Sequence, residues 1–110
     1  MGDFPKRYAI HFADLNPTIG AEIRKVRPVV VVSQNDMNRL LETVVACPLT
    51  TALHPQLRTR VQIVCAGRDA EIAVDQIRTI SKRRLRRQID RLSPGKAAEL
   101  RRVITEMYGE

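Results

Sequence analysis

The amino-acid sequence predicts a mostly β protein with α: a small, mostly antiparallel sheet or barrel that carries C-terminal helices. Three observations support this class. Short β-branched and apolar runs occupy most of the chain, the gaps between several of them are short enough for hairpins, and apolar residues at helical spacing gather at the end. At 110 residues, a single domain spanning 1–110 is expected.

The expected strands follow one another along the chain. Residues 8–15 are predicted to form the first, and the Asn-Pro and Gly that follow predict a loop of about ten residues, a length that is more often functional than accidental. Residues 28–33 are apolar on both faces, which predicts a strand buried on both sides. The further elements are a short helix with Asn35 or Asp36 as N-cap, strands over 44–49 and 60–64, and one or two strands within 71–80.

Two helices are expected after the strands. Ser81 would cap the first. Its apolar face would consist of Leu85, Ile89 and Leu92. The second would begin at the Ser-Pro pair 93–94, with serine as N-cap and proline at the first helical position. Its apolar residues recur at helical spacing: Ala97, Leu100, Val103, Ile104 and Met107.

The net charge of +7 is concentrated at the C-terminal end. From Arg78 onward, ten Lys and Arg residues stand against four Asp and Glu residues, so +6 of the +7 lies in the last third. Such a surface favours an anionic partner, either nucleic acid or an acidic protein segment. The densest run, SKRRLRRQIDR, has no interleaved aromatic residues for base stacking. It is expected to be a solvated face that attracts an anionic partner through its general charge.

Several classes of site and location are disfavoured. Cys47 and Cys65 each lie in an apolar run, without a CxxC motif or a histidine at ligand spacing, so buried, reduced thiols and no metal or other cofactor are expected. No apolar run approaches the roughly 18 residues of a membrane span, and the N-terminus lacks the apolar segment of a signal peptide. A cytoplasmic protein with no membrane partner is therefore expected.

Polar residues gather where the second expected strand begins and the third ends. Glu22, Lys25 and Arg27 precede or open the second strand, and Thr50 follows the third. Because neighbouring antiparallel strands bring the start of one beside the end of the other, Arg27 and Thr50 can share one edge of the sheet. An arginine beside a hydroxyl, with a carboxylate such as Glu22 or Asp75 in reach, suits phosphate handling. Position alone is equally consistent with an Arg27 that points to solvent at a strand end.

Three stretches, ADLNPTIGAEIRKVRPVVVVSQND, VVACPLTT and DQIRTISKRRL, resemble the MazF/PemK family of toxin endoribonucleases from toxin–antitoxin operons. The resemblance extends from about Arg7 to the final helix, and the run from Asp14 to Pro28 is its most specific part. It implies an SH3-like barrel of the CcdB/MazF type and a homodimer. It further implies metal-independent cleavage of single-stranded RNA at short preferred sequences, and inhibition by an antitoxin whose acidic, disordered tail covers the RNA groove. The chain departs from the family where Tyr8 and Ala9 replace the usual glycine and acidic residue.

The resemblance also implies roles for individual residues. Arg27 matches the family's catalytic arginine and Thr50 its catalytic threonine. Glu22 matches a motif position in the loop that closes over the site. In some members an aspartate matching Asp75 has an acid–base role, but the arginine that accompanies it there falls on Ala73 in this chain. The positions expected to contact RNA are Lys25, Thr51, Gln76 and Arg78.

The expected chemistry is attack by the RNA's own 2′-OH, which needs no metal. Arg27 would stabilise the charge that develops on the phosphate oxygens, and Thr50 would hold the phosphate by a hydrogen bond. Because an arginine does not readily lose its proton, a carboxylate or a relayed water has to accept the proton of the 2′-OH, with Glu22 as the first candidate and Asp75 as the second. The products would be 2′,3′-cyclic phosphate and 5′-OH ends. The two histidines are not expected to be catalytic, since His11 lies inside a strand and His54 in a turn.

Two other functions stay open. The first is a gyrase-inhibiting toxin of the CcdB family, which the polar C-terminal sequence EMYGE disfavours. The second is a non-catalytic barrel that binds RNA or protein, which the presence of both Arg27 and Thr50 disfavours.

Overall fold

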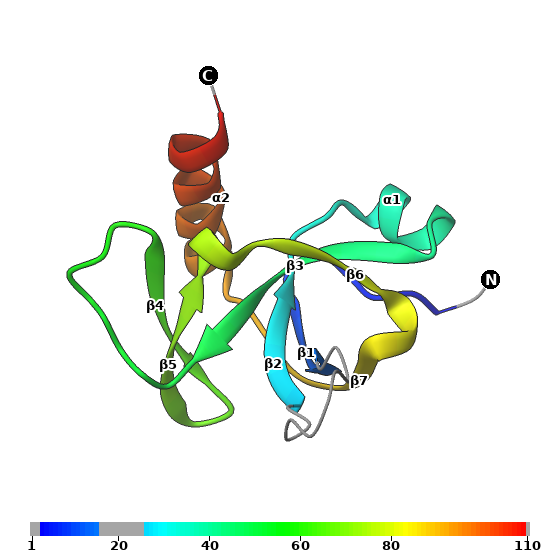
Figure 1. The fold of residues 1–110 in the computed structure, drawn as a ribbon, viewed down its shortest axis with the longest axis horizontal. Coiled ribbons are helices and arrows are strands. Elements are labelled where there is room, and N and C mark those ends of the chain that lie inside the picture. Colours follow the sequence, from blue (N-terminus) through cyan, green and yellow to red (C-terminus); the bar gives the residue numbers. More distant parts are fainter. Residues whose placement is uncertain (1–2, 16–25, 110) are drawn as a thin grey trace, which may run out of the picture.

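One curled antiparallel sheet organises the chain (Figure 1). The computed structural model describes residues 3–15 and 26–109, so Glu22 and Lys25 of the expected site lie outside the described residues. The strands are β1 (Ala9–Asp14), β2 (Val26–Val31), β3 (Thr43–Thr50), β4 (Arg60–Cys65), β5 (Arg68–Ala73), β6 (Arg78–Ser81) and β7 (Leu85–Arg91). The helices are α1 (Asn35–Leu40) and α2 (Pro94–Tyr108), with short 3₁₀ turns η1 (Val74–Gln76) and η2 (Lys82–Arg84).

The long strand β3 connects the two halves of the sheet. The strand order is β4-β5-β3-β2-β1-β7, and β6 also pairs with β3. The first half of β3 pairs with β6, as in Val44↔Ile80, whereas its end pairs with β5, as in Thr50↔Glu71. On its other side β3 pairs with β2. The predicted mostly β class with antiparallel strands is confirmed.

The valines of β2 and the residue after it alternate between two hydrophobic cores. Val30 and Val32 belong to the larger core, together with the buried residues of α2. Val29 and Val31 belong to a smaller core on the opposite face. The prediction that this strand is buried on both faces is confirmed, because successive side chains of a strand point to opposite faces.

Helix α2 begins as the sequence predicts. The Ser93 hydroxyl accepts a hydrogen bond from the backbone N–H of Lys96 at 3.2 Å, and Pro94 opens the helix. Its buried face consists of Ala97, Leu100 and Val103. Neither this helix nor any other among the described residues is long and apolar enough to cross a membrane.

The prediction of a helix after Ser81 is wrong. Ser81 accepts the N–H of Arg83, but it caps only η2, and Leu85–Arg91 form the strand β7. A spacing of four residues, as between Leu85 and Ile89, places two side chains on one face of a strand as well as of a helix, so this pattern does not distinguish a strand from a helix. Pairing with β7 covers the edge of β1, whose backbone groups would otherwise be unpaired. The predicted C-terminal helices are therefore reduced to one.

The short helix α1 is present, but its N-cap is Gln34 rather than Asn35 or Asp36. The Asn35 side chain instead accepts a hydrogen bond from the backbone N–H of Arg7 at 2.8 Å. This contact ties the start of the helix to the segment before β1, a pairing that local sequence does not reveal.

Tyr8 occupies the position at which the resembled family usually has glycine, and its φ of 70° lies in the left-handed region. This conformation costs a residue with a side chain about 1–2 kcal/mol. Contacts on both sides hold Tyr8 there: its N–H donates to the Val31 carbonyl at 2.7 Å, and its hydroxyl accepts from Arg101 at 3.0 Å. The turn into β1 is thus formed without the glycine.

The turn between β4 and β5 offers a stabilising substitution. Ala66 and Gly67 connect the paired residues Cys65 and Arg68, and both have positive φ, 50° and 82°. Two-residue hairpin turns with two positive φ angles favour Asn-Gly. Because asparagine tolerates the left-handed region better than alanine, we expect Ala66→Asn to raise the free energy of unfolding by about 0.5–1 kcal/mol. Urea titration of both proteins measures this difference, and an unchanged or lower value would contradict the explanation.

Candidate functional site

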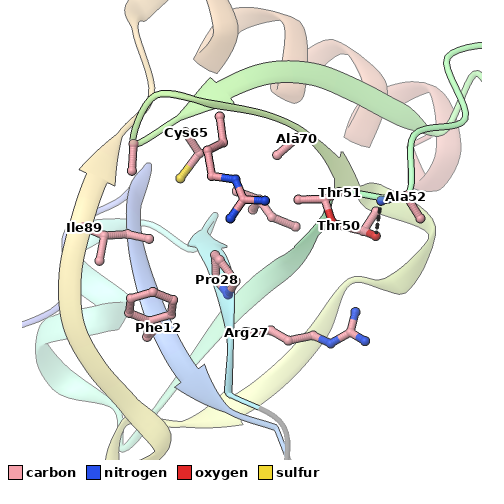
Figure 2. Close-up of a pocket in the computed structure, with 12 residues that line it drawn as sticks. Phe12, Arg27, Pro28, Thr50, Thr51, Ala52, Cys65, Ala70 and Ile89 are labelled. Carbon is pink, nitrogen blue, oxygen red and sulfur yellow. Dashed lines mark hydrogen bonds between the residues drawn. The ribbon is translucent and has the colours of Figure 1, made fainter.

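Arg27 and Thr50 meet at the edge shared by β2 and β3. The register pairs Val29 with Pro48, and its continuation by two residues sets Arg27 opposite Thr50. Both residues line an open cavity of about 520 Å³ (Figure 2) and a smaller one of about 180 Å³. The prediction that they share one edge of the sheet is confirmed.

The larger cavity combines apolar walls with two arginines. Phe12 of β1 and Ile89 of β7 lie together on one side of it, as Figure 2 shows, and Ala70 lies on another. Arg27 and Arg68 supply the charged lining. Apolar and aromatic surface suits the faces of nucleobases, and guanidinium groups suit phosphates. The composition of the cavity therefore fits a nucleic-acid strand.

The hydroxyl of Thr50 and the guanidinium of Arg27 are both available to a ligand. Thr50 Oγ1 accepts the backbone N–H of Ala52 at 3.1 Å (dashed line in Figure 2), which leaves its hydrogen free to donate. Arg27 is exposed, and among the described residues no hydrogen bond or ion pair engages it. The pair can therefore present two donors to one anion.

The other residues expected at the site are dispersed. Thr51 lines the larger cavity and Gln76 the smaller one. Arg78 is exposed on β6, and neither it nor Asp75 lines either cavity.

Asp75 is held in an ion pair rather than presented to a ligand. Its carboxylate accepts hydrogen bonds from Arg60 Nε at 2.9 Å and from the Thr59 hydroxyl at 2.8 Å. The hydrogen bond from Arg60 is the main reason that the pKa of Asp75 lies below its ordinary value, and it outweighs the opposing effect of burial. A carboxylate with a lowered pKa stays ionised and is a weak proton acceptor.

Sequence reasoning missed Glu71, the one fully buried carboxylate among the described residues. Glu71 accepts hydrogen bonds from Gln62 Nε2 at 2.8 Å, from the backbone N–H of His54 at 2.7 Å, and from Arg60. Arg60 thereby joins Glu71 to Asp75. A signal for this network was available, because the tight turn at 66–67 sets Gln62 directly opposite Glu71 in the hairpin.

The network makes the fold sensitive to acid. Burial raises the pKa of Glu71, but the hydrogen bonds from Gln62, His54 and Arg60 outweigh it, so that the pKa is lowered overall. Groups whose folded pKa is lowered, here Glu71 and Asp75, contribute stability that is fully present above their unfolded pKa of about 4 and is lost as the pH falls through the folded pKa.

We therefore expect a free energy of unfolding that is level between about pH 7 and 5 and falls below about pH 4. Urea titrations at a series of pH values measure the curve. Glu71→Gln should lose less stability below about pH 4 than the wild type does. If this variant keeps the full pH dependence of the wild type, other carboxylates dominate the sensitivity to acid. Asp90 is another carboxylate whose pKa is lowered, in its case by hydrogen bonds from the backbone N–H groups of Ala66 and Arg91. It therefore serves as the comparison for Glu71 within the same protein.

The two cysteines are free and buried, as predicted. Burial raises the pKa of Cys47 to about 12, with a further contribution from the charge of Asp75, and burial also raises the pKa of Cys65. Both thiols are therefore protonated at neutral pH. In the part of the chain that the structure describes, no three His, Cys, Asp or Glu side chains are grouped as metal ligands.

The basic run lies on η2 and β7 rather than on a helix. Some of its side chains have structural roles, since Arg84 donates to the Asp14 carbonyl at 3.0 Å and Arg86 lies 3.8 Å from the Asp14 carboxylate. Arg87 is exposed and lies 6.0 Å from the centre of the Phe12 ring at the larger cavity. The edge strand β7 thus brings positive charge to one wall of the site.

Comparisons with known proteins agree with this geometry. A family model described as a PemK-like, MazF-like toxin of type II toxin–antitoxin systems matches residues 6–108. Endoribonuclease EndoA of Bacillus subtilis (strain 168) is 38% identical over 92 residues, which are 79% of each chain. Among solved structures, the Mycobacterium tuberculosis toxin MazF-mt6 has a TM-score of 0.77 at 25% identity, with 91% of this chain and 95% of that chain covered. An endoribonuclease from Mycobacterial species, solved with its cognate antitoxin, has a TM-score of 0.80 at 23% identity, with 96% and 95% covered. The chain belongs to the PemK-like, MazF-like family of toxins of type II toxin–antitoxin systems.

Proposed function

We propose that this toxin is a metal-independent endoribonuclease that cleaves single-stranded RNA at a phosphate bound between Arg27 and Thr50. The observation that carries the proposal is that these two residues line the same cavities, and that among the described residues nothing pairs with the Arg27 guanidinium or accepts the hydroxyl hydrogen of Thr50. The relative from Bacillus subtilis is itself an endoribonuclease, which supports the reaction class.

The reaction is an internal transesterification. The 2′-oxygen forms a bond to phosphorus, the bond between phosphorus and the 5′-oxygen breaks, and the products carry a 2′,3′-cyclic phosphate and a 5′-OH. Negative charge develops on the non-bridging oxygens during this step, and a guanidinium already in place stabilises it more than it stabilises the ground state. Arg27 supplies this charge, and Thr50 donates a hydrogen bond to a phosphate oxygen.

RNA on either side of the cut would contact the cavity walls. Thr51 and Gln76 contribute polar groups from the two cavities. Lys25 and Arg78 are the basic positions that the sequence predicts to contact RNA. Glu22 and Asp75 are the carboxylates predicted from the sequence to move protons. Of these, Asp75 is a weak proton acceptor because Arg60 and Thr59 already bind it.

We infer further that the chain acts in the cytoplasm as a homodimer and is inhibited by a cognate antitoxin with an acidic, disordered tail. The family consists of toxins that are paired with antitoxins. The exposed arginines at the cavity and the net charge of +7 complement an acidic segment. Two free cysteines suit a reducing compartment.

The direct test is incubation of the purified protein with a long single-stranded RNA in excess EDTA, followed by mapping of the ends. We expect discrete cuts whose 5′ ends accept a kinase label without phosphatase treatment, because they carry 5′-OH groups. Intact RNA across many sequences would refute the proposal. Binding without cleavage would indicate a non-catalytic RNA-binding protein, and inhibition of gyrase supercoiling would indicate a CcdB-like toxin.

A further inference from the structure

We propose that His54 is the base that accepts the proton of the 2′-OH, an assignment that rests on the proposed RNA cleavage. The reaction needs a proton acceptor beside the phosphate, and His54 lines the smaller cavity together with Arg27 and Thr50. Of the residues that line this cavity, it alone has a side chain that ordinarily changes charge between pH 5 and 8.

The other acceptors among the described residues are poorly placed or chemically unsuited. Arg27 holds its proton too tightly to act as a base. Asp75 lies outside both cavities and is bound by Arg60 and Thr59. Cys65 lines the larger cavity, but burial raises the pKa of its thiol, so that it is protonated at neutral pH.

A hydrogen bond sets the tautomer of His54. Its Nδ1 lies 3.0 Å from the carbonyl oxygen of Ala52, and a carbonyl oxygen can only accept. Nδ1 therefore carries the hydrogen, and Nε2 presents its lone pair. The half-exposed ring leaves Nε2 open to a substrate, since 48% of the side chain is accessible.

Glu71 holds His54 in place through its backbone and lies close to its ring. The Glu71 carboxylate accepts the backbone N–H of His54 at 2.7 Å and lies 3.7 Å from Nδ1 of the ring. The Arg60 guanidinium is shared between Glu71 and Asp75, so this network of two carboxylates and one guanidinium carries a net charge of −1. An opposite charge within about 4–6 Å stabilises an imidazolium.

These groups complete the cleavage step. The proton of the 2′-OH moves to Nε2 of His54 as the 2′-oxygen bonds to phosphorus, and the Glu71 carboxylate, 3.7 Å from Nδ1, stabilises the resulting imidazolium. Arg27 stabilises the non-bridging oxygens. The 5′-oxygen leaves with the electron pair of its bond to phosphorus and takes a proton from water.

The test is the single-turnover cleavage rate of His54→Gln at saturating RNA. We expect it to fall by about 100-fold or more, the usual contribution of a general base, with RNA affinity unchanged. The variant keeps the backbone N–H that Glu71 binds, so its melting temperature should not change. His11→Gln is the matched control, because His11 is the other of two histidines and lines neither cavity. Imidazole in the buffer should restore part of the rate of His54→Ala.

An RNA with sulfur in place of the bridging 5′-oxygen separates a base from an acid. Its thiolate leaves without protonation, so His54→Gln should remain slow on this substrate if His54 is the base. Recovery of the wild-type rate would mean that His54 acts as the acid and would overturn the assignment. If His54→Gln cleaves ordinary RNA at the wild-type rate, the role of His54 is refuted and the proposed function is not. If the wild-type protein itself does not cleave RNA, the proposed function is refuted.

Discussion

Replacement of Arg27 by alanine is expected to lower the single-turnover rate of RNA cleavage by about 10²–10³-fold or more, the usual effect of removing a preorganised group that stabilises developing charge. Because Arg27 is exposed and nothing among the described residues engages its guanidinium, the free energy of unfolding should change by less than about 0.5 kcal/mol. Rapid-quench measurements in EDTA give the rate, and urea titration gives the stability.

Two further variants show whether position or charge accounts for this loss. Arg27→Lys keeps the charge but loses the planar fork that binds two phosphate oxygens, so it should recover only part of the rate. Arg102→Ala removes an exposed arginine of α2 that lines neither cavity, so this variant should cleave RNA at the wild-type rate. Equal losses in Arg27→Ala and Arg102→Ala would mean that the net charge, rather than the site, governs cleavage.

The largest expected effect on stability comes from Arg60. Arg60→Met leaves the fully buried Glu71 without its ionic partner, and breaking a buried pair in this way costs about 3–5 kcal/mol. The pair joins β4 to β5, and through Asp75 it also holds η1. Urea titration at pH 7 measures the loss. A change below about 1 kcal/mol, the typical value for an exposed pair, would show that Glu71 is not buried in solution.

A double variant separates the charge of this network from its packing. Arg60→Met/Glu71→Leu replaces both charged side chains by apolar ones and should recover most of the lost stability. It also removes the acceptor of the His54 N–H, so the loop that carries His54 loses its anchor. We therefore expect a protein that is stable but cleaves slowly. Recovery of both stability and cleavage would argue against any contribution of Glu71 to catalysis.

Local patterns were sufficient for much of the fold. The continuous valines of β2 predict burial on both faces, and the Ser-Pro pair at 93–94 predicts the start of α2, because each depends on residues that are close in sequence. The strand β7 was predicted as a helix because Leu85 and Ile89 fit either period. The open edge of β1 decided the outcome, and it lies some seventy residues away in sequence, as the contact between Asp14 and Arg84 illustrates.

At the site, too, some features follow from local sequence and others from contacts between distant residues. The meeting of Arg27 and Thr50 could be predicted from the order of the strands, since antiparallel pairing of adjacent strands places the start of β2 beside the end of β3. Three features of the site emerged only from the folded chain: Asp75 is bound by Arg60, Glu71 is buried, and His54 lines the smaller cavity with Arg27 and Thr50. Burial and ion pairing depend on contacts between strands and loops, which charge and spacing along the chain do not specify.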